Sequence, residues 1–459
     1  MNEPSFSLAA TFQELLGAKK YNTIRDVLVT MNPSDVAAVL DDVEEKGLPL
    51  LFRLLPKEQA AETFVEMDPE LQEILIRSFS DTELKEVLDE LYVDDAVDIV
   101  EEMPANVVKR ILMTADPQMR REINEILRYP ENSAGAWMTT EYVSLRPEMT
   151  VADAITRIRR TGVDKETIYT CYVTKDRLLL GLVTVKDLLL APDDSALIGD
   201  MMQTNVIYVN TTADQEEVAQ MFSKYNFLAL PVVDSGMRLV GIITFDDAMD
   251  VLQEEATEDI EIMAGMTPSD KTYLRSTPWD LFKHRIPWLL LLMVSATFTG
   301  MIISSFEGAL AAQVVLTAFI PMLMDTGGNS GSQSSVTIIR ALSLGELDFK
   351  DLPKVIWNEI RTAVMAGAVL SLACFGKIML VDRMLMGNAD VTPLVALVVC
   401  LTLAITVLVA KVIGCTLPMV AKRLGFDPAV MASPFITTAV DAVSLLVYFL
   451  IATTLLHLS

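Results

Sequence analysis

The chain has 459 residues, 51% of them hydrophobic, and its 62 acidic and 36 basic side chains give a net charge of −26. This length predicts about three domains, and the acid excess argues against nucleic acid as a partner and favours metal cations or basic partners. For most of these side chains, an acidic surface that only aids solubility is the simpler interpretation. Four cysteines lack paired spacing, there are two histidines, and neither a Walker loop nor a nucleophile elbow is present. The sequence therefore predicts no disulfide framework, no zinc site and no enzyme.

The charge is unevenly distributed along the chain. Residues 1–285 contain 52 acidic and 27 basic side chains, whereas residues 286–459 contain 10 and 9. A strongly acidic soluble portion therefore precedes a nearly neutral, apolar one. The first residues, MNEPSFSLAA, lack a positive region followed by an apolar core, so we expect no cleaved signal peptide.

Residues 1–130 are expected to form an all-α domain. Segments such as PKEQAAETFVEM, DPELQEILIRSF and SDTELKEVLDEL place apolar residues at three- and four-residue spacing, and Pro, Ser or Asp stands near several of their starts. The segments recur about every 12 residues, and each is too short to bury its apolar face alone. Stacking them into a small helical superhelix would bury those faces.

Residues 131–197 and 198–255 form two copies of one α/β unit. In each copy the predicted order is strand, helix, strand, strand, helix, and the copies end in the related phrases GLVTVKDLL and GIITFDDAM. This ordered repeat resembles a tandem pair of cystathionine-β-synthase (CBS) domains. The resemblance predicts one CBS domain over each range.

The end of the second copy continues into an acidic helix. Residues 246–261, DDAMDVLQEEATEDIE, carry eight carboxylates at helical spacing and no basic side chain. We expect an acidic linker region over residues 256–280, whose helix starts within residues 246–261. The carboxylates of interest are Asp246, Asp247, Asp250, Glu254, Glu255, Glu258 and Asp259. Like charges at this spacing repel each other, and bound Mg²⁺ would let the helix pack against another acidic element, for instance Asp94, Asp95 and Asp98. A solvated charged helix is the alternative.

Residues 281–459 are expected to form a transmembrane domain of five helices. The candidate spans are residues 286–306, 310–324, 356–381, 393–420 and 429–456. Each can reach the roughly 20 residues that cross a hydrocarbon core of about 30 Å. The basic residues beside the spans on one side are Lys283, Arg285, Arg340, Lys350, Lys354, Lys422 and Arg423. The positive-inside rule therefore places the N-terminal domains in the cytoplasm and the C-terminus outside.

Asp441 is the candidate pore residue. It lies in PFITTAVDAVSLLVYFL, near the middle of an apolar segment, where an ionisable group is costly and usually faces a partner or a water-filled path. A carboxylate is a hard oxygen ligand, suited to Mg²⁺, Ca²⁺ or Mn²⁺. In a symmetric dimer two such groups could meet on the axis, where they would need a divalent ion or a proton. The alternative is a neutral, hydrogen-bonded aspartic acid between helices.

A second candidate pore element is the polar stretch PMLMDTGGNSGSQSS, residues 321–335. Irregular polar backbone at membrane depth is tolerated only inside protein or beside water, and neutral oxygens can hold the water shell of a small ion without trapping it. The pore-lining candidates are Gly327, Gly328, Asn329, Gly331, Ser332 and Gln333. A small-residue surface for helix packing is the alternative.

Three further charged residues lie in or beside the expected spans. Lys411 is expected to snorkel to the cytoplasmic interface rather than to pair with a carboxylate. Asp427, in GFDPAV, is either a helix N-cap or a metal ligand at the inner pore mouth. Asp325 lies either at a pore mouth or at a helix cap.

Together these features resemble the MgtE magnesium channels over essentially the whole chain. The segments DTGGNSGSQSSVTIIRAL, RLGFDPAVMASPF and TTAVDAVSLLVYF are similar to membrane motifs of that family. The resemblance implies a homodimeric, Mg²⁺-selective channel in the cell membrane, whose pore follows the dimer axis. It also implies that Asp441 holds hydrated Mg²⁺ in the pore and that Asp427 belongs to a second site near the cytoplasmic mouth.

The same resemblance implies that the cytosolic domains sense Mg²⁺. Ions would bridge acidic residues of the N-domain, the CBS pair and the linker helix, and would close the channel when internal Mg²⁺ is high. The implied ligands are Asp95 or Asp94 together with the carboxylates of residues 246–259, and Glu216 and Asp234 are candidate additions. Some members of the family bind ATP at the CBS pair, so ATP is a candidate ligand.

Two other functions fit parts of the sequence. One is a nucleotide-gated carrier of another substrate such as an organic anion, although an anion path favours basic pore residues and Lys411 is the lone candidate. The other is a non-transporting membrane sensor, which leaves Asp441 and the polar stretch unexplained. For the channel, the expected partners are Mg²⁺, a second copy of the chain and membrane lipid, with no nucleic acid.

Overall fold

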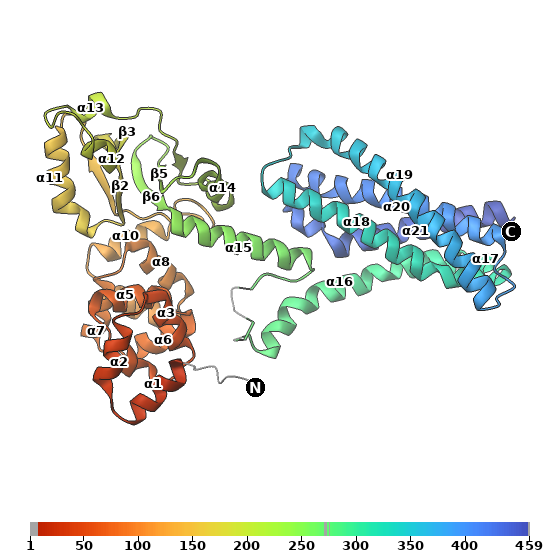
Figure 1. The fold of residues 1–459 in the computed structure, drawn as a ribbon, viewed down its shortest axis with the longest axis horizontal. Helices are drawn as coiled ribbons and strands as arrows, with labels where there is room; N and C mark the ends of the chain where they lie inside the picture. Colours follow the sequence, from red (N-terminus) through yellow and green to blue (C-terminus); the bar gives the residue numbers. More distant parts are fainter. Residues whose placement is uncertain (1–7, 270–272, 275, 458–459) are drawn as a thin grey trace. The chain divides into compact units, whose positions relative to one another are not determined.

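The computed structural model describes residues 8–269, 273–274 and 276–457, apart from the side chain of Ser433. The first seven residues, on which the expected absence of a signal peptide depends, lie outside the described residues, as do four residues of the linker region expected over 256–280. The chain forms two compact units, Met1–Leu252 and Gln253–Ser459 (Figure 1).

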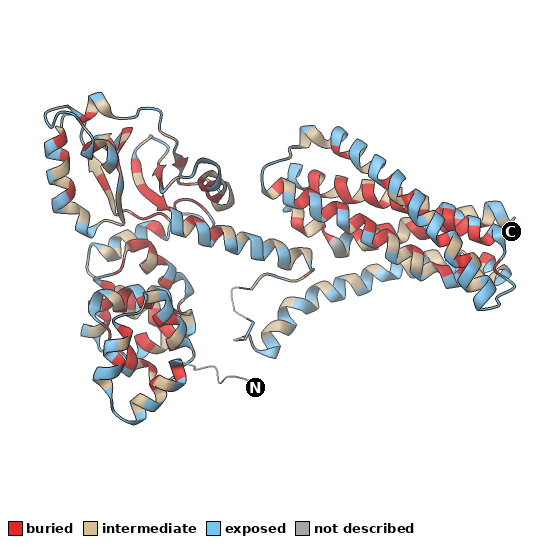
Figure 2. Cartoon of the chain, in the orientation of Figure 1, coloured by how far each residue is buried: buried red, intermediate tan, exposed pale blue. Residues whose placement is uncertain are grey.

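The first part of the first unit is all-helical, as the sequence predicts. Its helices are α1 (Leu8–Gly17), α2 (Tyr21–Leu28), α3 (Pro33–Asp41), α4 (Leu48–Phe52), α5 (Lys57–Val65), α6 (Pro69–Ser78), α7 (Asp81–Leu88), α8 (Val93–Glu102), α9 (Ala105–Thr114) and α10 (Met119–Ile126). Caps fix several starts: Asn32 and Asp68 each accept a backbone N–H and precede a proline at the first helical position, and Ser80 forms a capping box with Glu83. The helices stack along the chain and share one hydrophobic core (Figures 1 and 2).

The second part of the first unit carries the two predicted α/β repeats. The first contains β1 (Tyr142–Leu145), α11 (Val151–Thr161), η1 (Gly162–Asp164), β2 (Thr167–Lys175), β3 (Leu178–Thr184) and α12 (Val185–Leu189). The second contains α13 (Ile198–Met201), β4 (Val209–Asn210), α14 (Gln215–Tyr225), β5 (Ala229–Val233), β6 (Leu239–Thr244) and the start of α15 (Phe245–Met263). In each sheet the first strand is parallel to the second, and the second and third form an antiparallel hairpin.

The related phrases that end the two repeats start a helix in the same way. Thr184 and Thr244 each end the last strand of a sheet, and their hydroxyl groups donate to Asp187 and Asp247, three residues later. The backbone N–H of each threonine contacts the same carboxylate, at 3.1 and 3.4 Å. The T-x-x-D pattern is therefore a helix cap. It also fixes Asp247 in the first turn of α15.

The second unit is a bundle of long helices. It contains the end of α15, α16 (Pro278–Ser305), α17 (Glu307–Ala312), η2 (Val314–Phe319), α18 (Ile320–Ser343), η3 (Phe349–Asp351), α19 (Leu352–Lys377), η4 (Ile378–Leu385), α20 (Pro393–Arg423), η5 (Pro428–Met431) and α21 (Ser433–Leu456). The helices α18, α20 and α21 pack against one another, and α19 packs on α20. Their contact faces are buried, whereas α16 exposes most of its apolar side chains (Figure 2).

Four helical segments among the described residues are long and apolar enough to cross a membrane. They are Pro278–Ser305, Phe349–Leu385, Pro393–Arg423 and Pro428–Leu456, and they overlap the first, third, fourth and fifth expected spans. The second expected span, residues 310–324, is wrong, because these residues form α17, η2 and only the beginning of α18. The polar stretch 321–335 is not irregular either. It lies inside the continuous helix α18, which satisfies its backbone hydrogen bonds internally.

Candidate functional site

Five carboxylates from four segments of the first unit lie close together, and we call them the acidic cluster. Asp94 and Asp95 lie in the first turn of α8, Glu141 and Glu166 directly precede β1 and β2, and Asp247 lies in the first turn of α15. Each of the other four carboxylates repels that of Asp94. The structure thus brings the predicted acidic residues of α8 and α15 close together. It also places two glutamates beside them that the sequence did not predict.

The acidic cluster contains buried oxygen atoms that have no hydrogen-bond donor among the described residues. Asp94 is 7% exposed, and its Oδ1 atom has no partner; the same is true of Oε2 of Glu166. Glu141 differs, because its Oε2 atom accepts hydrogen bonds from the N–H of Val93 at 3.2 Å and the hydroxyl of Thr139 at 2.9 Å. A buried carboxylate oxygen without a donor is costly. A bound cation would supply the missing partner.

Burial and mutual repulsion raise the pKa values in the acidic cluster. The pKa of Asp95 rises to about 7, that of Glu166 to about 8 and that of Asp247 to about 6, and that of Asp94 rises well above its usual range. Burial is the largest cause in all four, and repulsion by neighbouring carboxylates adds to it. Burial also raises the pKa of Glu141, against its two hydrogen bonds. Near neutral pH the cluster therefore retains protons unless a cation compensates its charge.

The donor set fits a hard divalent cation, because every ligand is a carboxylate oxygen. Within the described residues, however, no three His, Cys, Asp or Glu side chains are already arranged to hold a metal ion. The two observations are compatible, since carboxylates without a cation between them repel one another. A cation would have to draw the cluster together as it binds.

Four of the other acids of α15 form an exposed stripe. Asp246, Asp250, Glu254 and Glu258 recur every four residues, and all four are exposed. Glu66, at the end of α5, lies close enough to Asp250 to repel it. The two interpretations of the acidic helix thus apply to different faces. One face carries exposed carboxylates, of which Asp246 lies close enough to repel Asp95 and Glu166, and Asp247 on another face joins the acidic cluster.

Asp259 and Asp427 lie close together in the second unit. The sequence predicts different roles for them, Asp259 in the sensor and Asp427 at the inner pore mouth. Asp259, near the end of α15, accepts a hydrogen bond from the hydroxyl of Ser343 at 3.0 Å. Burial, and then repulsion from Asp427, raises the pKa of Asp259 against that hydrogen bond. Asp427 accepts the N–H of Ala429 at 2.7 Å and caps η5, so the N-cap interpretation holds for one of its oxygens. Its metal role stays a prediction.

Asp441 and Asp325 are a second carboxylate pair in the helix bundle. Asp441 is half-buried on α21, and Asp325 on α18 lies close enough to repel it. The Oδ1 atom of Asp325 accepts a hydrogen bond from the amide of Asn329 at 3.0 Å. Asp325, Asn329 and Gln333 recur every four residues on the exposed side of α18, and we call them the polar stripe.

The glycines of α18 lie on its buried side and serve helix packing. A Cβ atom at Gly327 would lie 2.7 Å from Cγ2 of Thr406, and one at Gly331 would lie 2.7 Å from Cγ2 of Ile436. The packing alternative therefore accounts for them. Of the six pore-lining candidates, the buried ones are Gly327, Gly328 and Gly331, and the exposed or half-buried ones are Asn329, Ser332 and Gln333.

Lys411 does not snorkel to the interface, so that expectation is wrong. Its side chain is 8% exposed, and its Nζ atom lies 3.1 Å from Oγ of Ser334 and 3.6 Å from Oε2 of Glu359. Ser334 donates to the same Glu359 oxygen at 2.6 Å. Lys411 lies on a side of α20 that is covered by α18 and α19, so a carboxylate on α19 neutralises it inside the bundle.

Sequence reasoning missed Glu141, Glu166 and Glu359. A signal existed for the first two, because β1 and β2 are parallel and residues that precede parallel strands meet at the same edge of a sheet. The N–H of Glu166 indeed donates to the carbonyl of Glu141 at 3.0 Å. For Glu359 the signal was its place as an acidic residue within an expected span. Lys411, a basic residue in another expected span, needed a partner of opposite charge.

The structure places the two additional sensor candidates in local roles. Glu216 lies in the first turn of α14 and accepts a hydrogen bond from the amide of Gln220 at 3.2 Å. Oδ1 of Asp234 accepts the N–H groups of Gly236 and Arg238, each at 2.8 Å, and so orders the turn between β5 and β6. Their metal roles stay predictions.

Family models match most of the chain. A model described as a divalent cation transporter matches residues 320–451, the MgtE intracellular N domain matches residues 31–132, and the CBS domain matches residues 134–194 and 198–254. The matches cover the helical part from α3 onward, the two α/β repeats, and the helix bundle from α18 into α21.

Whole proteins and solved structures give the same picture. The magnesium transporter MgtE of Thermus thermophilus is 37% identical over 455 residues, which cover 98% of this chain and 99% of that protein. The magnesium transporter MgtE of Bacillus subtilis is 33% identical, with 96% of each chain covered. The cytosolic domain of the Mg²⁺ channel MgtE in complex with ATP has 38% identity and a TM-score of 0.51, covering 53% of this chain and 100% of that one. The soluble part of a magnesium transporter has 31% identity and a TM-score of 0.50, covering 54% and 98%.

Proposed function

Because this chain belongs to the MgtE family of divalent cation transporters, we propose that it is a Mg²⁺-selective channel for magnesium uptake and homeostasis, closed by internal Mg²⁺. The observation that carries the transport part is the pair Asp441 and Asp325, two carboxylates that repel each other on helices of an apolar bundle. Charges of one sign at such a place favour a path or site for the opposite charge. The names of the similar proteins support Mg²⁺ as that ion.

The proposed pore lies on the axis of a homodimer. The polar stripe of α18 is exposed on the single chain, and lipid would cover such side chains poorly. A second copy related by twofold symmetry would cover them and would place two Asp441 carboxylates near one axis. Hydrated Mg²⁺ would then be held by Asp441, with amide and hydroxyl oxygens of Asn329, Ser332 and Gln333 along the path.

The proposed sensor of internal Mg²⁺ is the acidic cluster. Mg²⁺ would give Asp94 and Glu166 the partners that their buried oxygens lack, and would hold Asp247 of α15 beside α8. Without Mg²⁺, repulsion among the five carboxylates favours release of α15. The exposed acids of α15, together with Glu255, Glu216 and Asp234, are the candidates for additional ligands.

The end of α15 links the sensor to the proposed inner pore mouth. Ile262 and Met263 pack against Ile339 of α18 and against Ala429 and Ala432 beside η5. Asp259 and Asp427 lie next to this contact as two carboxylates that repel each other. A Mg²⁺ ion shared by this pair would fix the end of α15 against α18 and close the inner mouth.

The proposed membrane arrangement has five spans, with α18 as the second. Its polar side chains would account for why only four candidate spans are apolar enough among the described residues. The basic residues beside the spans support the proposal that the N-terminal domains are in the cytoplasm of the cell and the C-terminus is outside. ATP is proposed as a regulatory ligand of the CBS pair, because the similar cytosolic domain of an MgtE channel is a complex with ATP.

The proposal is tested by Mg²⁺ flux into liposomes that contain the purified protein. The full chain should conduct at low Mg²⁺ on the cytosolic side and stop at millimolar Mg²⁺, whereas a chain that lacks residues 1–262 should conduct in both conditions. The variant Asp247→Asn with Asp250→Asn should also conduct at millimolar Mg²⁺. Loss of all flux on deletion would favour a non-transporting sensor, and flux of an organic anion without Mg²⁺ flux would favour a carrier of another substrate.

A further inference from the structure

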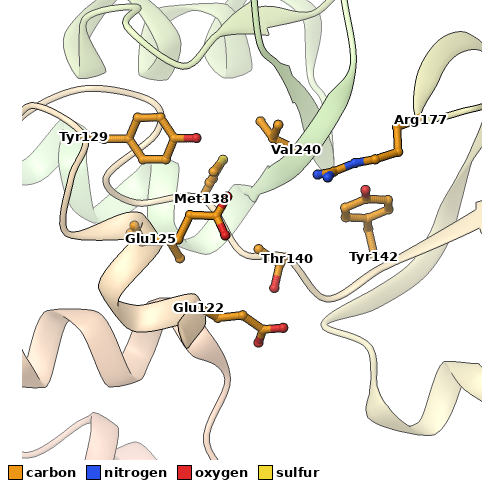
Figure 3. Close-up of a pocket in the computed structure, with 9 residues that line it drawn as sticks. Glu122, Glu125, Tyr129, Met138, Thr140, Tyr142, Arg177 and Val240 are labelled. Carbon is orange, nitrogen blue, oxygen red and sulfur yellow. The ribbon is translucent and has the colours of Figure 1, made fainter. Parts of the chain in front are cut away.

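A cavity of about 240 Å³ lies inside the first unit, between the end of the helical part and the two α/β repeats. Figure 3 shows Glu122, Glu125 and Tyr129 on the α10 side of this cavity and Tyr142 and Arg177 on the side of the repeats. None of these five residues belongs to the acidic cluster. The cavity adjoins the acidic cluster, since Glu122 lies close enough to Glu141 to repel it, but the two are lined by different side chains.

The backbone holds Arg177 at the rim of the cavity. Asp176 and Arg177 form the two-residue turn between β2 and β3, with φ angles of +53° and +68°, the left-handed conformation that such a hairpin requires. The carbonyl oxygen of Arg177 accepts the N–H of Leu239 at 2.8 Å. Asparagine or glycine suits this conformation better than arginine does. The side chain of Arg177 therefore points to a role of its own.

The guanidinium group of Arg177 lowers the pKa of the two tyrosines that line the cavity. Burial raises the pKa of Tyr129 and of Tyr142, and Arg177 opposes the rise in both. Glu125 and Asp234 act on Tyr129 in the other sense and raise its pKa further. Positive and negative groups thus face one cavity from its two sides.

These charges do not neutralise one another. No ion pair joins Arg177 to Glu122 or Glu125 in the described part of the chain. Glu122 accepts a hydrogen bond from the neutral amide of Gln118 at 3.1 Å, which leaves its negative charge uncompensated. The lining therefore suits a ligand that presents positive charge to the two glutamates and negative charge to Arg177.

The rest of the lining suits a short hydrocarbon chain. Ile126, Met138 and Val240 contribute apolar surface, and the rings of Tyr129 and Tyr142 add aromatic surface that also attracts ammonium groups. The volume is below the about 300 to 1,000 Å³ of pockets for drug-sized ligands. The occupant is therefore limited to a molecule of about the size of an amino acid.

We propose that this cavity binds a small molecule with two ammonium groups and one carboxylate, the class of the basic amino acids, of which L-lysine is the probe. Arg177 binds the carboxylate through its planar donor groups, Glu122 and Glu125 bind the ammonium groups, and the apolar lining covers the methylene chain. A divalent metal ion fits less well, because the guanidinium group of Arg177 in the same lining would repel it. A phosphate group fits less well, because it would face both glutamates. The inference does not depend on the proposed transport function.

The test is calorimetric binding of L-lysine to the full-length protein in detergent. L-Norleucine lacks the side-chain ammonium group and cadaverine lacks the carboxylate, so both should bind more weakly than L-lysine. Arg177→Gln should weaken L-lysine binding about tenfold or more without weakening cadaverine binding. Glu122→Gln with Glu125→Gln should weaken both. The matched controls Arg160→Gln and Glu45→Gln change exposed residues elsewhere and should leave all affinities unchanged.

Three results would overturn the inference. L-Lysine does not bind at millimolar concentration; cadaverine binds as tightly as L-lysine, so that the carboxylate is not recognised; or Asp247→Asn removes binding while the cavity variants retain it, so that the ligand occupies the acidic cluster. If Arg177→Gln does not fold, Arg177→Lys keeps the charge and loses the planar fork. That variant should still bind L-lysine more weakly than the wild type, and unchanged affinity would count against the inference.

Discussion

Replacing Asp247 by asparagine tests whether repulsion in the acidic cluster destabilises the Mg²⁺-free protein. The pKa of Asp247 rises from 3.8 to about 6, mainly because the carboxylate is buried and then because of neighbouring carboxylates, against its bonds to Thr244. A shift of this size corresponds to about 3 kcal/mol. A raised carboxyl pKa stabilises the folded state below about pH 4, and this contribution is lost as the pH rises through about 6. At pH 8 the folded protein therefore carries the whole cost of the ionised group.

Asp247→Asn should remove most of this cost, because an amide is neutral and can still accept the hydrogen bond from Thr244. At pH 8 without Mg²⁺, the free energy of opening measured by amide hydrogen exchange in α8 should rise by up to about 3 kcal/mol. At pH 4 the variant and wild type should agree. Added Mg²⁺ should protect α8 in the wild type much more than in the variant, and Asp26→Asn, an exposed control, should behave as the wild type. Equal protection of α8 by Mg²⁺ in Asp247→Asn and wild type would refute this reasoning.

Three further predictions concern the helix bundle and the pH dependence. Lys411→Met should destabilise the detergent-solubilised protein by about 3 to 5 kcal/mol because it leaves the half-buried carboxylate of Glu359 without its cation, with only the hydrogen bond from Ser334. Adding Glu359→Leu should recover part of that loss, and an additive double variant would contradict the pairing. Gly414→Ala should cost about 1 to 3 kcal/mol because its Cβ would collide with the backbone of α18, whereas Gly376→Ala, with open space around it, should cost little. Without Mg²⁺, the protection of α8 should fall as the pH rises from about 4 to about 8, because the cluster has pKa values of about 6 to about 8; a flat profile would argue against charge repulsion in the cluster.

Much of the first unit could be predicted from sequence because its signals are local. Helix caps such as Asn32 followed by Pro33, and the repeated T-x-x-D phrase, fix where helices start without help from distant residues. The approach of α15 to α8 could be predicted from matching acidic patterns. Glu141 and Glu166 belong to the acidic cluster because β1 and β2 are parallel neighbours in one sheet. That information becomes available only once the sheet is assigned.

The helix bundle was harder to predict because hydropathy does not show which side of a helix is buried. The apolar residues before Ile320 look like a span, but they form the short segments α17 and η2. The long helix in this region is α18, which carries the polar stretch. The middle of the buried side of α18 is made of glycine and serine, which score as polar although they pack tightly. Lys411 was misjudged for the same reason. Its partner Glu359 lies on another helix, and only the tertiary packing brings them together.

The most direct test of the central claim is Mg²⁺ uptake by cells that cannot grow without added magnesium, comparing the wild type with Asp441→Ala and Asp441→Asn at equal amounts in the membrane. Wild-type protein should restore uptake and growth, and both variants should fail while the purified proteins keep the same assembly state, because neither side chain offers a charged oxygen ligand to the ion. Restored uptake by both variants would show that Asp441 is a structural, hydrogen-bonded residue and that the ion path does not run beside it.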